Sequence, residues 1–298
     1  MVWFCCCAER TDLLNELKNS MCILNKFFNT RKGAYMTYIK EYWQNKEQRA
    51  MTARNHTKEM QEKYGDCIRN AVSATKIYND TSFKNSLKET SSIETPTIIV
   101  ENIDSVGAIM KYGNPSTAVL NFSSYKNPGG LFLDGSKAQE ESLCHESFLY
   151  NVLKEYQTDF YDWNNQHKNK ALYLNRGLFS PGIWFFRKDE HAKCSVITCA
   201  SPNKSSAQKY MNVSDEENSK ALRSRIKFVL DIAKDNNITT LILGAYGCGV
   251  FGQDATEVAS IFKEYLLTTH TCFDKVVFAI PNSKDGNLEK FVKVFSWN

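Results

Sequence analysis

Two adjacent carboxylates at the end of a glycine-rich loop could carry acid–base chemistry. Glu140 and Glu141 close a loop over residues 121–139 that is rich in Gly, Asn and Pro. The apolar run 117–120 before this loop predicts a buried strand, and helical spacing after the glutamates predicts a helix start. Glutamates in such a place can donate and accept protons. From the residues alone, a surface loop with two solvated glutamates is an equally good interpretation.

A second glycine-rich loop has the composition of a diphosphate site. Residues 247–252 read Gly-Cys-Gly-Val-Phe-Gly, follow the apolar run 241–243 and precede a helix that Asp254 opens. Glycines at this spacing let backbone N–H groups approach a pyrophosphate at a helix N-terminus. A dinucleotide fold would also place an acidic residue after the next strand, where Pro281 and Asn282 stand. The pattern therefore indicates a diphosphate without hydride transfer, and a ligand-free tight turn is the alternative.

Alternating strands and helices surround these two loops. Strand-like runs lie at 97–100, 117–121, 183–186, 194–200, 238–243 and 275–280. Helical spacing occurs at 104–112, 139–156, 215–235, 254–267 and 285–295, and further helices are expected at 9–30, 35–64 and 67–75. This alternation predicts an α/β fold with a mixed, mostly parallel sheet.

The N-terminal part of the chain differs from the rest. The first 80 residues are predicted to be all-helical, and the polar segment 79–95 reads as a loop or linker. We therefore expect a helical N-terminal region over residues 1–95 and an α/β domain over residues 96–298, which could pack together as one unit.

Both glycine loops leave the carboxyl end of a predicted strand. Open α/β sheets bind ligands outside those ends, so parallel strands would bring the two loops to one cleft. One loop would hold a diphosphate and the other would present two carboxylates. The residues alone thus favour an enzyme that acts on a nucleotide diphosphate sugar.

Composition and charge exclude several other classes. The 298 residues are 42% hydrophobic and 23% charged with a net charge of +4, which is ordinary for a globular protein and gives no signal for nucleic acid. No apolar stretch approaches the roughly 18 residues of a membrane span, and the Cys-rich start lacks the features of a signal peptide. We expect a cytoplasmic monomer, with nuclear entry left open.

Cysteine and histidine do not suggest a metal or a thiol site. The ten cysteines form no CxxC pair and the five histidines no HExxH pair, so no metal and no cofactor are predicted. Cys144 and His145 are adjacent, but neighbouring residues on a helix do not face each other. We expect the cysteines to be reduced and mostly buried.

The two loops together resemble a known family. The ordered motifs are Asn121-Phe122, Asn127-Pro128-Gly129-Gly130, Ala138-Gln139-Glu140-Glu141, Ser180-Pro181, Val196-Ile197-Thr198 and Leu243-Gly244-Ala245-Tyr246-Gly247-Cys248-Gly249-Val250-Phe251-Gly252. In this order they resemble the microbial-type poly(ADP-ribose) glycohydrolases over about residues 47–296. The resemblance implies a macrodomain-like three-layer α/β/α sandwich, here with an N-terminal helical extension. One residue departs from the family pattern, because Leu131 stands where a third glycine is usual.

The resemblance also implies a reaction and a set of site residues. ADP-ribose would occupy the cleft, and the enzyme would hydrolyse ribose–ribose O-glycosidic bonds of poly(ADP-ribose) on ADP-ribosylated proteins. Glu141 would be the general acid and base, with Glu140 holding ribose hydroxyls and Gln139 orienting the pair. The remaining substrate-binding residues would be Asn121, Gly129, Gly130, Gly247, Cys248, Gly249, Val250, Phe251 and Gly252. Asn102 and Asp104 would lie near the adenine.

Two other functions stay open from the sequence. A macrodomain that binds ADP-ribose without cleaving it is one, although two intact glutamates argue against it. A hydrolase of mono-ADP-ribosyl linkages is the other. Leu131 leaves the substrate range and the level of activity open.

Overall fold

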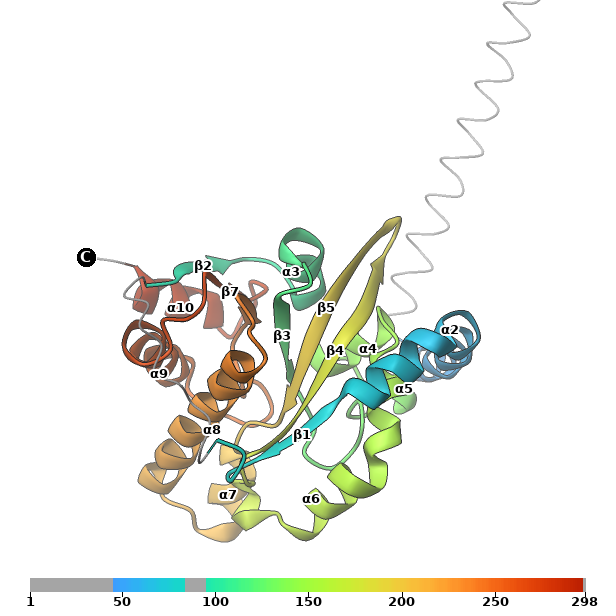
Figure 1. Cartoon of the computed structure of the whole chain (residues 1–298). Helices are drawn as coiled ribbons and strands as arrows, with labels where there is room; N and C mark the ends of the chain where they lie inside the picture. The colour runs from blue at the N-terminus through green and yellow to red at the C-terminus, as the bar shows by residue number, and fades with distance from the viewer. Residues whose placement is uncertain (1–44, 84–94, 297–298) are drawn as a thin grey trace, which may run out of the picture.

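The computed structural model describes residues 45–83 and 95–296, and this part of the chain forms three layers (Figure 1). The central layer is a seven-stranded sheet with the order β1-β4-β5-β3-β6-β7-β2. The strands are β1 Lys76–Asn79, β2 Thr97–Glu101, β3 Thr117–Phe122, β4 Arg176–Arg187, β5 Glu190–Cys199, β6 Thr240–Leu243 and β7 Lys275–Ala279. The neighbours from β5 through β3, β6 and β7 to β2 pair in parallel, whereas β4 pairs antiparallel with both β1 and β5.

Helices cover both faces of this sheet. One face carries α8 Asp215–Asp235, α9 Ala255–Thr268 and α10 Asn287–Phe295, and the other carries α2 Lys46–Ala74, α3 Ser105–Tyr112, α4 Gln139–His145 and α5 Leu149–Leu153. Alternate residues of β3 serve the two cores, because Leu120 packs with the first set of helices and Val119 with the second. The predicted three-layer sandwich with a mixed, mostly parallel sheet is therefore confirmed.

Most predicted elements are confirmed with small shifts of their ends. The strand expected at 183–186 is longer than predicted, because β4 begins at Arg176. The helix expected at 139–156 is a second exception, because the chain leaves the helix between α4 and α5. There, Ser147 bridges to Phe185 of β4, and the N–H of Phe186 donates to the carbonyl of Glu146 at 2.7 Å. This pairing interrupts the helix in favour of a contact with the sheet. Short turns follow where irregular structure was expected, as η2 Lys154–Tyr156, a π-helical turn η3 Gln157–Asp162, α6 Trp163–Gln166 and η4 Asn169–Ala171.

No helix was predicted between the strand-like run 194–200 and the helix at 215–235. The structure has α7 Lys204–Met211 in this polar segment. The side chain of Asn203 caps this helix by accepting the N–H of Ser206 at 3.0 Å. A cap of this kind stabilises the first turn of a helix that has only one buried residue, Ala207.

The N-terminal part also differs from the all-helical prediction. The described part of the helix expected at 35–64 and the helix expected at 67–75 form one helix, α2, with a kink at Tyr64, while residues 35–44 lie outside the described residues. Residues 76–79 form β1, a strand at the sheet edge that pairs with β4. The helix expected at 9–30 lies outside the described residues. The boundary near residue 95 stays a prediction, because residues 1–44 and 84–94 are not described.

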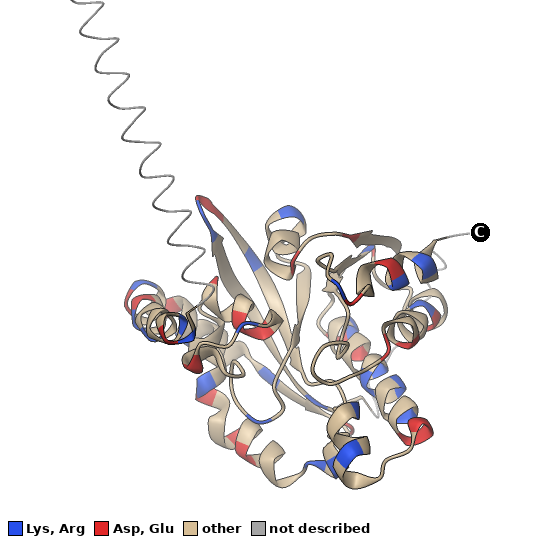
Figure 2. Ribbon diagram, turned by 180° about the vertical axis from the view of Figure 1, so that it is seen from behind, with Lys and Arg blue, Asp and Glu red and all other residues tan. Residues whose placement is uncertain are grey.

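The positions of basic and acidic residues are interspersed along the helices that cover the sheet (Figure 2). Within the described residues, no helix combines the length and the apolar character that a membrane crossing requires.

Candidate active site

Gln139 fastens the start of α4 to the end of β3. Its Oε1 accepts the N–H of Phe122 at 2.8 Å, and its Nε2 donates to the carbonyl of Leu120 at 2.8 Å and to Ser105 Oγ at 3.1 Å. The side-chain amide thus pairs with the strand backbone as a neighbouring strand would. Because Glu140 and Glu141 follow directly, this anchor fixes where both carboxylates stand.

Glu140 is buried at the carboxyl end of β3, with only 3% of its surface exposed. Its Oε2 accepts the N–H of Ser124 at 2.6 Å, and its Oε1 accepts Asn121 Nδ2 at 3.2 Å. Burial raises the pKa of this carboxyl to about 8, because these hydrogen bonds compensate only part of the lost hydration and Glu141 adds like charge. Glu140 is therefore largely protonated near neutral pH.

Glu141 is also buried, and backbone amides hold both of its oxygens. The N–H of Leu131 donates to Oε1 and the N–H of Ala138 donates to Oε2, each at 3.0 Å. These donors come from the two sides of the segment that joins the glycine loop to α4. These two hydrogen bonds fix the position of the Glu141 carboxylate beside the first glycine loop.

The glycine loop passes directly over the two carboxylates. Gly130 has φ +63°, and a Cβ added to it would lie 2.6 Å from Glu141 Oε1 and 2.9 Å from Glu140 Oε2. Gly129 has φ +65°, and a Cβ added to it would lie 2.8 Å from a ring carbon of Tyr150. Both positions therefore require glycine, for their backbone conformation and for space.

Leu131 does not share this requirement. Its φ is −111°, which any residue adopts, and its side chain is 49% exposed. The departure from three glycines is therefore compatible with the same backbone and with the hydrogen bond from Leu131 N–H to Glu141.

The second glycine loop connects β6 to α9. Gly247 and Gly252 have φ +77° and +73°, and an added Cβ would collide with the hydroxyls of Ser201 and Ser205 respectively. Gly249 differs, because a Cβ there would meet no atom within 4 Å. The ends of this loop are thus packed against the protein, while its middle is open to an incoming group.

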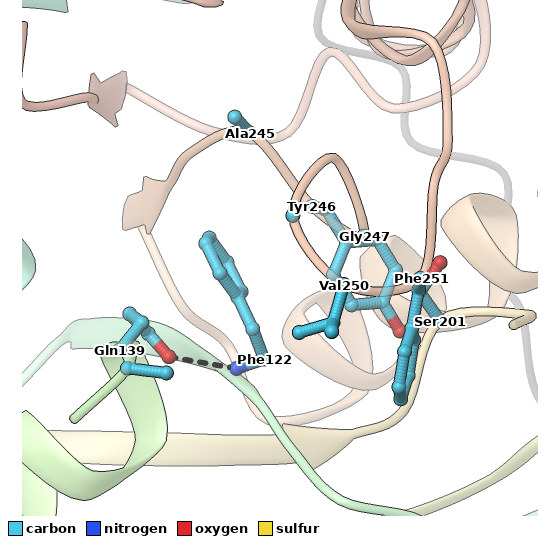
Figure 3. Close-up of a pocket in the computed structure, with 10 residues that line it drawn as sticks. Phe122, Gln139, Ser201, Ala245, Tyr246, Gly247, Val250 and Phe251 are labelled. Carbon is cyan, nitrogen blue, oxygen red and sulfur yellow. Dashed lines mark hydrogen bonds between the residues drawn. The ribbon is translucent and has the colours of Figure 1, made fainter. Parts of the chain in front are cut away.

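A cavity of about 240 Å³ lies between the start of α4 and the second glycine loop (Figure 3). The predicted residues Gly129, Gly130, Glu140 and Glu141 do not line it. Five predicted residues line it, Gln139, Gly247, Gly249, Val250 and Phe251. The sequence reasoning missed its other walls, which are Phe122, Ala138, Ser201, Ala245 and Tyr246. Of these, Phe122, Ala138, Ala245 and Tyr246 belong to the quoted motifs, so the motif positions were the available signal.

An adjoining cavity of about 520 Å³ shares Phe122, Ala138, Gln139 and Ala245 with the first. It extends to Asp104 and to the segment after β7. Asn102 Oδ1 accepts the N–H of Asn282 at 2.8 Å, so this asparagine supports the cavity wall. The two cavities together form one elongated cleft at the carboxyl ends of β2, β3, β6 and β7.

Three other predicted residues, Asn121, Cys248 and Gly252, do not line either cavity. Asn121 is fully buried between Glu140 and Thr198, and its Oδ1 has no hydrogen-bond partner within the described part of the chain. Cys248 packs against the core, and burial raises the pKa of its thiol to about 12. Gly252 closes the loop through its N–H to the carbonyl of Gly249 at 3.0 Å.

A mostly parallel α/β/α sandwich with a cleft at its strand ends, flanked by two glycine loops, defines a macrodomain-like protein. The profile described as microbial-type PARG, catalytic domain, matches residues 42–188. The chain is therefore similar to the microbial-type poly(ADP-ribose) glycohydrolases (PARG) over this region, as its motifs predict. No curated protein sequence gave a significant match.

Solved structures of bacterial glycohydrolases have the same fold. Poly(ADP-ribose) glycohydrolase from Thermomonospora curvata has a TM-score of 0.76 and 29% identity, over 84% of this chain and 100% of that chain. The structure of that protein bound to the inhibitor ADP-HPD has a TM-score of 0.72 at the same identity and coverage. The Deinococcus radiodurans protein in complex with ADP-ribose has a TM-score of 0.69 and 29% identity, over 77% of this chain and 97% of that chain.

Proposed function

We propose that this chain is a poly(ADP-ribose) glycohydrolase that cleaves ribose–ribose O-glycosidic bonds and releases ADP-ribose. The observation that carries the proposal is the pair of buried, backbone-held glutamates next to a cleft whose other wall is a diphosphate-type glycine loop. The family match and the ADP-ribose complex of a relative support the same substrate. ADP-ribosylated proteins are the proposed partners.

The cleft has a place for each part of ADP-ribose. The diphosphate would lie against the open middle of residues 247–252, where backbone N–H groups and the N-terminus of α9 favour negative charge. The distal ribose would then lie near Asn121, whose buried Oδ1 is an acceptor for a hydroxyl. The adenine side would take the larger cavity near Asp104.

Glu141 is the proposed general acid and base. Cleavage of the glycosidic bond proceeds through an oxocarbenium-like state and requires a proton for the leaving ribose oxygen. Protonated Glu141 donates that proton, and its carboxylate then takes a proton from the water that adds to the ribose carbon. Burial raises the pKa of Glu140 to about 8, so this neighbour of Glu141 is largely uncharged near neutral pH.

Glu140 and Gln139 have supporting roles in this proposal. Glu140 holds ribose hydroxyls, and the contacts of Gln139 with β3 keep both glutamates in place. We further propose that the protein acts as a monomer in the cytoplasm, with access to the nucleus left open.

The function is tested with purified poly(ADP-ribosyl)ated protein and with mono-ADP-ribosylated protein as separate substrates. Released ADP-ribose is quantified for the wild type and for Glu141→Gln. We expect the wild type to release ADP-ribose from the polymer and the variant to be inactive. Binding of ADP-ribose without release would indicate a reader, and release from the mono-modified protein alone would indicate a hydrolase of that linkage.

A further inference from the structure

The first turns of α2 lie against the segment that connects the glycine loop to α4. Arg49 of α2 is 6% exposed, and its Nε donates to the carbonyl of Gly135 at 2.7 Å. Gly135 has φ +73°, and an added Cβ would collide with the carbonyl oxygen of Lys46. The backbones of the helix and the loop are therefore in contact, and the Arg49 guanidinium is a buried polar link between them.

This contact point lies between the two donors to Glu141. Leu131 N–H and Ala138 N–H hold the two carboxylate oxygens. The intervening segment is folded on itself, because Gly135 N–H donates to the carbonyl of Phe132 and Ser136 N–H donates to that of Leu131, both at 3.1 Å. A shift of this segment at residue 135 would consequently move both donors to Glu141.

The same helix also contacts the chain that follows α4. His56 Nε2 lies 2.8 Å from the carbonyl oxygen of Ser147, and Asn151 Nδ2 of α5 donates to the carbonyl of Thr57 at 2.9 Å. With Arg49 bound to Gly135 before α4 and His56 next to Ser147 after it, α2 contacts the segments on both sides of α4.

We propose that Arg49 is a positioning residue for the Glu141 carboxylate and acts through Gly135. The proposal rests on the proposed function, in which Glu141 transfers the proton. Arg49 stands in the helix that precedes the sheet, 92 positions before Glu141 (141 minus 49), and no motif of the cleft includes it. A misplacement of a catalytic group by about 1 Å can lower turnover about 100-fold. Loss of this link should therefore affect catalysis more than substrate binding.

The first test measures kcat and ADP-ribose affinity for Arg49→Ala, Arg49→Lys and Arg54→Ala. Arg54 is an exposed arginine of the same helix and serves as the matched control. We expect Arg49→Ala to lower kcat by about 10- to 100-fold with an almost unchanged affinity for ADP-ribose. Arg49→Lys should keep part of the activity, because an ammonium group can still donate to the Gly135 carbonyl. Arg54→Ala should match the wild type.

A second readout does not require turnover. Hydrogen exchange at the Leu131 and Ala138 amides should be faster in Arg49→Ala, while the amides of β6 and β7 keep their wild-type rates. Wild-type kcat in folded Arg49→Ala, or unchanged exchange at both amides, would overturn the proposal. If Arg49→Ala does not fold, Arg49→Lys decides by the same criteria. A wild type that releases no ADP-ribose would contradict the proposed function, and the exchange result would still test the positioning role.

Discussion

The two glycine loops of the cleft have opposite surroundings. In the loop over residues 127–138, Gly130 lies against Glu140 and Glu141, and α2 packs on the far side. In the loop over residues 247–252, Val250 is 89% exposed and Gly249 faces open space. In the proposed function, the fixed geometry of the first loop would serve proton transfer, whereas the open backbone of the second loop would receive a charged group of the substrate.

The largest expected effect comes from filling the space over the glutamates. Gly130→Ala forces a side chain to within 3 Å of both carboxylates at a φ that favours glycine. We expect turnover to fall by at least about 1000-fold and stability by about 1–3 kcal/mol. Kinetics and thermal unfolding measure the two effects. Gly249→Ala is the control in the open loop, and equal losses in both variants would contradict the comparison.

The burial of Glu140 predicts a pH dependence of stability. Its pKa is raised from 4.5 to about 8 in the folded protein, so the folded state binds the extra proton between these values. The contribution is fully present below pH 4.5 and is lost as pH rises through 8, by about 5 kcal/mol in all. Urea unfolding of the wild type and of Glu140→Gln across this range measures it. The same dependence of unfolding free energy on pH in both proteins would show that the pKa of Glu140 is not raised.

The packed end of the second loop should respond to substitution more weakly than the first loop. Gly247→Ala introduces a Cβ that collides with the Ser201 hydroxyl at a positive φ. We expect a loss of about 1–3 kcal/mol in stability and about 10-fold in ADP-ribose affinity, with a smaller change in kcat. Gly286→Ala controls for backbone strain alone, because Gly286 has φ +65° and the nearest atom to an added Cβ, Glu289 Oε2, lies 3.8 Å away. An unchanged affinity in Gly247→Ala would argue against a diphosphate at this loop.

The smallest effect is expected at Leu131. Its backbone conformation needs no glycine and its side chain is 49% exposed, so Leu131→Gly should change kcat by less than about threefold and stability by less than about 1 kcal/mol. Turnover on the polymer and thermal unfolding provide the measurements. A tenfold gain would show instead that the leucine side chain obstructs the substrate.

Much of this fold follows from local pattern, because β3 is an uninterrupted apolar run and α8 has apolar residues at helical spacing. Short elements do not follow from it. β1 has four residues and exists because β4 offers a pairing edge, and α4 ends where Ser147 bridges to β4. These are contacts between residues far apart in sequence, which periodicity does not report.

The same distinction holds for the cleft. Glu140, Glu141 and the two glycine loops stand out in the sequence because their residue types and spacing have a chemical meaning. Gln139 could be placed beside them by its motif, but its hydrogen bonds to the β3 backbone require the fold. Arg49 gives no sequence signal, since its role depends on a contact with Gly135, 86 residues later.

The central claim is that Glu141 transfers the proton while the opposite loop holds the substrate. Its most direct test measures turnover of poly(ADP-ribose) and calorimetric affinity for ADP-ribose on the same preparations of wild type and Glu141→Gln. The account predicts a loss of kcat of about 100- to 10,000-fold with ADP-ribose affinity retained. Undiminished kcat in Glu141→Gln would contradict it.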